Sequence, residues 1–246
     1  MMSSNAFDCF FDLRESKQIP KLSSLLKKSS ALLFLWPIET YLPAKPETYL
    51  SASEQQRLKN FSSPQRQKQF LASRYYCKTL LAEFLQIKPS QLDFETQDEG
   101  KLVLPAAFQK SGIDFNFSHT ETLFLLGVST SHWIGVDIEP QTKKANQTEV
   151  AERIFSDLER KWIEATDGIH KTERFFRLWS LKESIIKAAA GGVFRHVQEI
   201  KLLPQEDSLH LKALPEDFGL LSDWQIFENK DIVGFSCAWA LKKHYE

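Results

Sequence analysis

The apolar positions of this chain follow two spacings, one typical of strands and one of helices. A continuous apolar run, Ala31–Trp36, is followed by Pro37 and predicts a buried strand. Apolar residues at helical spacing across Phe70–Leu85 predict a long helix. That helix should begin at Ser63-Pro64, an N-cap followed by proline, and close before Pro89. The first third of the chain therefore combines a buried strand with a long helix.

Short apolar segments predict strands after this helix and again near the end of the chain. The expected ranges are Leu92–Glu95, Leu102–Leu104, Ile113–Phe117, Leu123–Val128, Trp133–Ile138, Ile200–Leu203, Leu209–Ala213, Trp224–Phe227 and Ile232–Trp239. A second long helix, from Lys171 to Ala190, is expected to stop at Gly191-Gly192. Two Ser-x-x-Glu capping boxes, at Ser51 and Ser156, each predict the start of a short helix.

The order of strand, capped short helix, long helix and strands occurs in both halves of the chain. This repetition is compatible with an α+β protein of two pseudo-symmetric lobes, residues 1–130 and 131–246. Active sites often lie between two such lobes, so we expect one there.

Composition excludes several classes of function. With 42% hydrophobic and 26% charged residues, the 246-residue chain has a globular profile. Its net charge of −1 offers no general attraction to nucleic acid or a membrane surface, and we expect neither as a partner. Three widely spaced cysteines, Cys9, Cys77 and Cys237, indicate neither a disulfide framework nor a zinc site. Without a signal peptide or a long apolar run near the start, a cytoplasmic location is expected.

Three acidic residues stand where they should converge. Asp137 and Glu139 lie two apart on a predicted strand and share a face. On the predicted helix, Trp179, Glu183 and Lys187 recur every four residues and should form one polar stripe. Converging carboxylates repel one another unless a hard divalent cation such as Mg²⁺ lies between them. Lys182 and Lys187 nearby suggest a phosphorylated substrate. Taken singly, the first pair could be a solvated strand end, and the helical pair could be surface decoration.

A polar segment, Asn116–Thr120, ends another predicted strand. Its histidine could reach a phosphate or a ribose, or it could be a structural side chain. The sequence contains no Gly-x-Ser-x-Gly elbow, no Walker A loop and no Gly-x-Gly-x-x-Gly, so hydrolase, ATP and dinucleotide functions lose their usual support.

Three segments in this order resemble the main motifs of the Sfp-type 4′-phosphopantetheinyl transferases. They are Asn116–His119, Gly135–Glu139 and Trp179–Lys187, and the accessory pieces Gly100-Lys101 and Arg153–Ser156 resemble that family as well. The resemblance implies two pseudo-symmetric α+β lobes with coenzyme A bound between them. It also implies transfer of phosphopantetheine from coenzyme A to a serine of an apo acyl or peptidyl carrier protein, with release of adenosine 3′,5′-bisphosphate.

The resemblance also assigns roles to residues. Asp137, Glu139 and Glu183 would hold Mg²⁺, with Mn²⁺ as a possible substitute, and Glu183 would be the base, directly or through a metal-bound water. Lys187 would contact the pyrophosphate and Lys182 would assist. The expected coenzyme A contacts are Arg57, Arg74, Thr96, Gly100, Lys101, Asn116, Ser118, His119, Lys182 and Lys187. At position 54, glutamate stands where some relatives carry a lysine near the 3′-phosphate.

Two other functions stay open at this point. A Mg²⁺-dependent nuclease or nucleotidyl transferase would also use clustered carboxylates with lysine, although the slight net acidity disfavours nucleic acid. A catalytically silent relative would bind carrier proteins without transferring anything. An internally duplicated enzyme needs no second chain to complete its site, so a monomer is expected. The sequence does not distinguish between the carrier proteins of different pathways.

Overall fold

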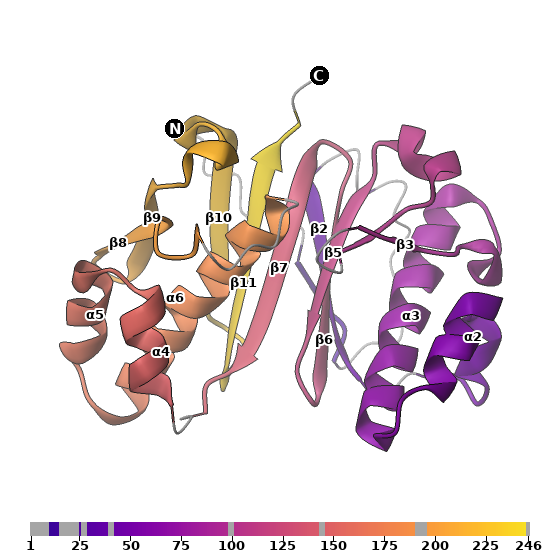
Figure 1. Ribbon diagram of the computed structural model, residues 1–246, viewed down its shortest axis with the longest axis horizontal. Helices are drawn as coiled ribbons and strands as arrows, with labels where there is room; N and C mark the ends of the chain where they lie inside the picture. The colour runs from indigo at the N-terminus through magenta and orange to yellow at the C-terminus, as the bar shows by residue number, and fades with distance from the viewer. Residues whose placement is uncertain are drawn as a thin grey trace. The chain divides into compact units, whose positions relative to one another are not determined.

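The computed structural model describes residues 10–14, 25, 29–38, 42–97, 101–142, 146–189 and 196–244. The chain divides into two compact units, Met1–His132 and Trp133–Glu246. Each unit contains a β-sheet with helices packed against it (Figure 1), which confirms the α+β class. Within the described residues, none of the helices has the length and apolar character that crossing a membrane would require.

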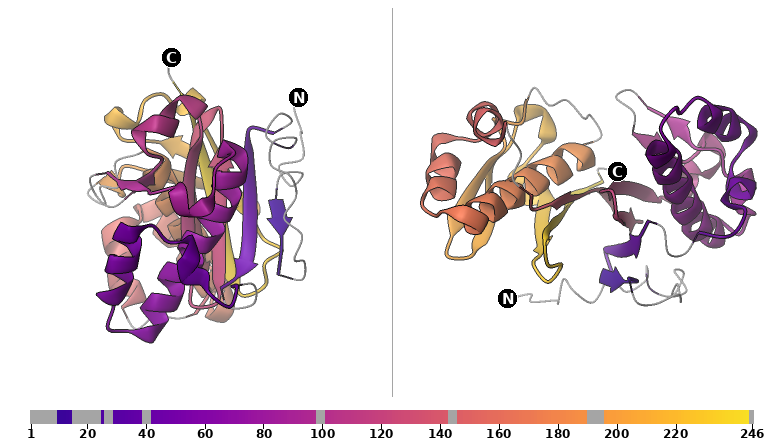
Figure 2. Two further views of the ribbon diagram at one scale, coloured as in Figure 1. Left: turned by 90° about the vertical axis from the view of Figure 1, so that its right-hand side faces the viewer. Right: turned by 90° about the horizontal axis from the view of Figure 1, so that it is seen from below.

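The first unit is built on a four-stranded sheet with the order β1-β2-β6-β5. Strand β1 runs parallel to β2 (Figure 2), whereas β2 and β6, and β6 and β5, are antiparallel. The elements of this unit are β1 Phe10–Asp12, β2 Ala31–Pro37, α2 Ala52–Lys59, α3 Pro64–Leu85, β3 Glu95–Thr96, β4 Leu102–Val103, β5 Asp114–His119 and β6 Leu123–Ser129, with 3₁₀ turns at Pro46–Tyr49, Pro89–Gln91 and Ala106–Ser111. Strands β3 and β4 form a separate ladder of two.

The second unit has a three-stranded sheet with the order β10-β11-β7 and a separate hairpin, β8-β9. Its elements are β7 His132–Pro140, α4 Gln147–Ile154, α5 Asp157–Glu164, α6 Gly168–Ala188, β8 Lys201–Gln205, β9 Ser208–Ala213, β10 Trp224–Asn229 and β11 Phe235–Lys243, with 3₁₀ turns at Glu216–Phe218 and Leu221–Asp223. The strand order β7-β11-β10 repeats the order β2-β6-β5 of the first unit. In each case an early strand, β7 or β2, pairs with the last strand of the unit, and the last strand pairs with the one before it in sequence.

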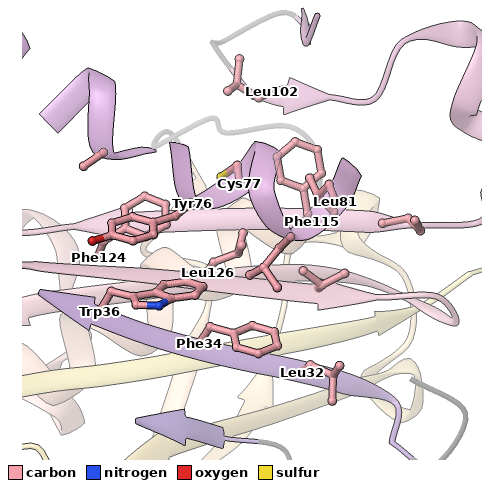
Figure 3. Packing of buried hydrophobic residues seen from close by; sticks show 14 of the residues in the cluster. Leu32, Phe34, Trp36, Tyr76, Cys77, Leu81, Leu102, Phe115, Phe124 and Leu126 are labelled. Carbon is pink, nitrogen blue, oxygen red and sulfur yellow. The ribbon is translucent and has the colours of Figure 1, made fainter. Parts of the chain in front are cut away.

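Aromatic packing fixes α3 on the sheet of the first unit (Figure 3). The ring of Trp36 on β2 stacks on Tyr76 of α3, with 4.7 Å between ring centroids. The Tyr76 hydroxyl donates a hydrogen bond of 2.8 Å to the Pro37 carbonyl, which satisfies its only polar group. Phe34 continues the stack on the far side of Trp36. Helix α3 is therefore held in one register on the sheet, and its side chains keep fixed positions.

Most expected elements are present, and the differences have local causes. Of the predicted strand Leu92–Glu95, only Glu95 belongs to a strand, β3, because Leu92 closes a 3₁₀ turn and packs into the core. The last strand begins at Phe235, after a turn in which Gly234 has a φ of 79°. Helix α6 is capped at Ala189, and the predicted stop at Gly191-Gly192 lies outside the described residues.

Both capping boxes also form, and the glutamate of each box also forms an ion pair with a lysine of the long helix. Glu54 of α2 receives the backbone N–H of Ser51, and its carboxylate forms an ion pair with Lys78 of α3. In the second unit, Glu159 of α5 caps its own helix and pairs with Lys182 of α6 at 2.9 Å. In both units a buried glutamate–lysine pair thus fastens the short capped helix to the long one.

Candidate functional site

The first unit contains a cleft of about 390 Å³ beside the first half of α3, here called the basic cleft. Its lining residues are Arg57, Phe61, Arg66, Gln69, Phe70, Ser73, Arg74, Thr96, Leu102, Phe117 and His119. The lining contains three guanidinium groups and an imidazole but no carboxylate. Such a cleft suits a phosphorylated ligand, because arginine presents paired donors to phosphate oxygens.

Helices α2 and α3 and strands β3, β4 and β5 contribute most of these side chains. Arg66, Phe70 and Arg74 recur at four-residue spacing and so lie along one side of α3. Phe117 and His119 alternate on β5 and therefore face the same side of the sheet. Four of the expected contacts, Arg57, Arg74, Thr96 and His119, line the cleft, whereas Arg66 and Gln69 were missed. For Arg66, the spacing of eight residues from Arg74 was visible in the sequence.

Arg74 is the most constrained cation of the basic cleft. It is buried, its Nε lies 2.8 Å from Glu54 Oε1, and its guanidinium lies over the Phe70 ring at 4.6 Å from the centroid. Burial lowers the pKa of Arg74, and the Glu54 carboxylate opposes that change. His119, by contrast, is exposed and stacks on Phe117. The cleft therefore combines one fixed guanidinium with groups open to solvent.

Some expected coenzyme A contacts do not reach the basic cleft. Asn116 and Ser118 alternate with Phe117 and His119, so they lie on the opposite face of β5. The Lys101 ammonium pairs with Asp114 at 3.1 Å. Gly100 lies outside the described residues. Only some of the residues expected to contact coenzyme A therefore line the basic cleft.

The second unit carries Asp137, Glu139, Glu183 and Lys187, here called the acidic cluster. A Cβ added to Gly135 of β7 would lie 2.0 Å from the Ser184 carbonyl oxygen of α6, so the strand runs directly against the helix backbone. Asp137 and Glu139 follow at alternate positions and point to the same side as that glycine. Lys187 Nζ lies 2.7 Å from Asp137 Oδ1 and donates to the Val136 carbonyl at 3.1 Å.

Negative charge accumulates in the acidic cluster. The pKa of Glu183 is raised to about 7, mainly by burial and also by the Asp137 and Glu139 carboxylates, while the Lys187 ammonium opposes the rise. In the described part of the chain, no three His, Cys, Asp or Glu side chains are already grouped as ligands of one ion. The cluster therefore fits a divalent cation by its hard oxygen donors and excess negative charge, and not by a preformed ligand geometry.

We expect this pKa to appear in the pH dependence of stability. The folded state holds the Glu183 proton more tightly than the unfolded state, whose ordinary pKa is 4.5. The stabilisation is complete below pH 4.5 and is lost as the pH rises to about 7. As the pH rises through this range, the free energy of unfolding of the metal-free wild type should fall relative to that of Glu183→Gln by on the order of 2 kcal/mol. Urea unfolding of both proteins at each pH measures this difference. A difference that stays constant with pH would contradict the assigned pKa.

Two residues of α6 differ from their expected placement. Lys182 was expected to assist in the acidic cluster, but its ammonium points into the core, where it contacts Glu159 and the carbonyls of Ile154 and Val197. Only 1% of the Lys182 side chain is exposed, because α5 covers that flank of α6. Trp179, expected on the polar stripe, instead packs against the core and stacks on Phe175. Lys182 is therefore a structural residue.

Comparison with known proteins matches both units separately. A profile described as "4′-phosphopantetheinyl transferase, N-terminal" matches residues 44–131, and one for the 4′-phosphopantetheinyl transferase superfamily matches residues 134–239. The 4′-phosphopantetheinyl transferase HetI of Nostoc sp. is 32% identical over 158 residues, which cover 64% of this chain and 67% of HetI. The 4′-phosphopantetheinyl transferase Sfp of Bacillus subtilis is 31% identical over 181 residues, which cover 68% of this chain and 77% of Sfp.

Proposed function

The chain belongs to the 4′-phosphopantetheinyl transferase superfamily and is an enzyme of that kind, and from this premise we propose its full reaction. Phosphopantetheine passes from coenzyme A to a serine of an apo acyl or peptidyl carrier protein, in a Mg²⁺-dependent step. The serine oxygen forms a bond to the phosphorus that carries pantetheine, the pyrophosphate P–O bond breaks, and adenosine 3′,5′-bisphosphate leaves. The observation that carries this proposal is Glu183, with its pKa near 7, one turn before Lys187 and beside Asp137.

We assign the chemical step to the acidic cluster. Asp137, Glu139 and Glu183 would hold the divalent cation, which when bound neutralises the pyrophosphate and acts as a Lewis acid at the attacked phosphorus. Glu183 would accept the serine proton, directly or through a water, because its carboxylate lies one helical turn before Lys187 and close to Asp137. Lys187 supplies a positive charge to the leaving bisphosphate as negative charge develops there. Partial exposure of Lys187, 26% of its side chain, supports this role.

We assign the nucleotide of coenzyme A to the basic cleft. Arg57, Arg74 and His119 provide cationic or hydrogen-bonding groups for the 3′-phosphate, and Arg66 adds a fourth group that the sequence motifs do not contain. No ion pair occupies Arg57 or Arg66 among the residues that the structure describes. Their charges are therefore available to an anionic ligand. This cleft favours coenzyme A over substrates that lack a phosphorylated nucleotide.

The reaction is tested by the intact mass of an apo carrier protein after incubation with the enzyme, coenzyme A and Mg²⁺. The expected result is a mass gain of one phosphopantetheine, which disappears when EDTA removes the metal. Transfer that persists in EDTA would contradict the metal assignment. Carrier binding without any mass gain, across several unrelated carriers, would instead identify a silent relative, and transfer of a nucleotide would identify a nucleotidyl transferase.

A further inference from the structure

Three buried charges lie beneath the basic cleft, here called the buried triad: Glu54, Arg74 and Lys78. Glu54 Oε1 faces Arg74 Nε at 2.8 Å, and Glu54 Oε2 accepts a short hydrogen bond from Lys78 Nζ. All three side chains are almost fully buried, and the exposed fraction of Lys78 is 0%. Of the three, only Arg74 lines the cleft. The triad therefore presents one guanidinium to the ligand and keeps its other two charges out of contact.

The charges of the buried triad do not cancel. Two cations share one carboxylate, so the triad itself carries a net charge of +1. The Asp93 carboxylate favours the charge on Lys78, but it is not among the charges that act on Arg74. Burial lowers the pKa values of both Arg74 and Lys78, and the nearby Arg57 guanidinium further disfavours the charge on Arg74. An anion bound in the cleft would reduce the repulsion between these like charges. Because the charges are buried, their electrostatic effect on that anion is screened less than it would be in water.

We propose that Lys78 is a positioning residue that sets the charge of the basic cleft. By neutralising Glu54 from below, Lys78 leaves the charge of Arg74 uncompensated and directed at a phosphomonoester. Without Lys78, Glu54 would cancel Arg74 and the triad would be neutral. Lys78 thereby determines the preference for coenzyme A over its 3′-dephospho form. This inference rests on the proposed function, because it takes the 3′-phosphate as the ligand group in the cleft.

In the second unit the corresponding glutamate–lysine pair contributes no side chain to the neighbouring cleft, whose lining includes Ser156 and Leu202 but neither Glu159 nor Lys182. Glu159 pairs with Lys182, and its oxygens also accept the backbone N–H groups of Ser156 and Leu202. One cation balances one carboxylate there, so the pair is neutral. Lys78→Met and Lys182→Met therefore remove equivalent buried ammonium groups, and only the first changes the charge beneath the basic cleft. Lys182→Met is the matched control for any loss of stability.

The test measures the dissociation constants of coenzyme A and of 3′-dephospho-coenzyme A by calorimetry, in the full-length protein, and takes their ratio. Lys78→Met should reduce the preference for coenzyme A about tenfold, the effect of one unit charge acting through a protein interior. Glu54→Gln/Lys78→Met restores a net charge of +1 on Arg74, and glutamine retains the capping box. This double variant should recover the wild-type ratio, and Lys182→Met should not change it. A purely structural role of Lys78 predicts no recovery in the double variant.

Glu54→Gln alone keeps the test decisive if Lys78→Met does not fold. If net charge controls the cleft, this variant binds coenzyme A with a preference at or above wild type, whereas a purely steric role of Glu54 in holding Arg74 predicts a fall. Wild-type preference in a folded Lys78→Met protein would overturn the inference while leaving the proposed function intact. If the wild-type protein itself shows no preference, and Arg57→Ala binds coenzyme A equally well, the nucleotide assignment of the basic cleft fails instead.

Discussion

Glu183→Gln is expected to slow phosphopantetheinyl transfer by about 10³-fold or more, with no loss of stability in the metal-free protein. The change keeps the size of the side chain but removes a charged oxygen that we propose as metal ligand and proton acceptor. Each role alone contributes a factor of roughly 10² or more to a rate. A neutral amide also avoids burying a charge beside Asp137 and Glu139, so folding is not penalised.

Two measurements separate this effect from general damage. Steady-state turnover at saturating coenzyme A reports the rate, and Mn²⁺ titration followed by electron paramagnetic resonance reports the affinity of the metal. Both should fall in Glu183→Gln. Glu173→Gln changes another partly buried glutamate of the same helix, whose side chain contacts His170 and not the acidic cluster. It should retain the wild-type rate. Turnover of Glu183→Gln above a tenth of wild type would contradict both roles.

Gly135→Ala is expected to destabilise the protein by at least about 3 kcal/mol, although it adds a single methyl group. The new Cβ would lie 2.0 Å from the Ser184 carbonyl oxygen and 2.4 Å from the Ala188 nitrogen. Both are backbone atoms, so no side-chain rotation relieves the overlap, and β7 must separate from α6. Transfer activity should be lost as well, because that separation pulls Asp137 away from Lys187.

Urea unfolding of the full chain measures the first effect. The matched control is Gly168→Ala, at the start of α6, where a Cβ meets nothing within 4 Å but the glycine has a φ of 60°. That substitution carries a backbone cost of roughly 1 kcal/mol and no steric overlap. Equal destabilisation by the two substitutions would mean that the close approach of β7 to α6 does not limit position 135.

The elements most accurately predicted were those specified by neighbouring residues. Both capping boxes signal a helix start within four residues, and both helices begin at the expected positions. Likewise, the alternation that places Asp137 and Glu139 on one face is a property of any strand. The arginine stripe of α3 was equally local, so Arg66 could have been found from its spacing to Arg74.

The misplaced residues were those whose surroundings come from distant parts of the chain. Helical periodicity places Lys182 on a flank of α6 but does not show that α5 covers that flank and supplies Glu159. Trp179 was assigned to the polar stripe for the same reason, whereas Phe175 and the core receive it. The buried triad was also not predicted, because Glu54 and Lys78 are 24 residues apart and each resembles an ordinary surface charge.

The long helices of the two halves can be aligned on the lysines of their buried glutamate–lysine pairs. Aligning Lys78 with Lys182 places Thr79 opposite Glu183 and Glu83 opposite Lys187. The first half thus has a hydroxyl at the position of the proposed base, and a carboxylate at the position of the Lys187 ammonium. In both halves the lysine joins the long helix to the short capped helix. Under the proposed function, the residue directly after this lysine would distinguish the half that carries the reaction from the half that does not.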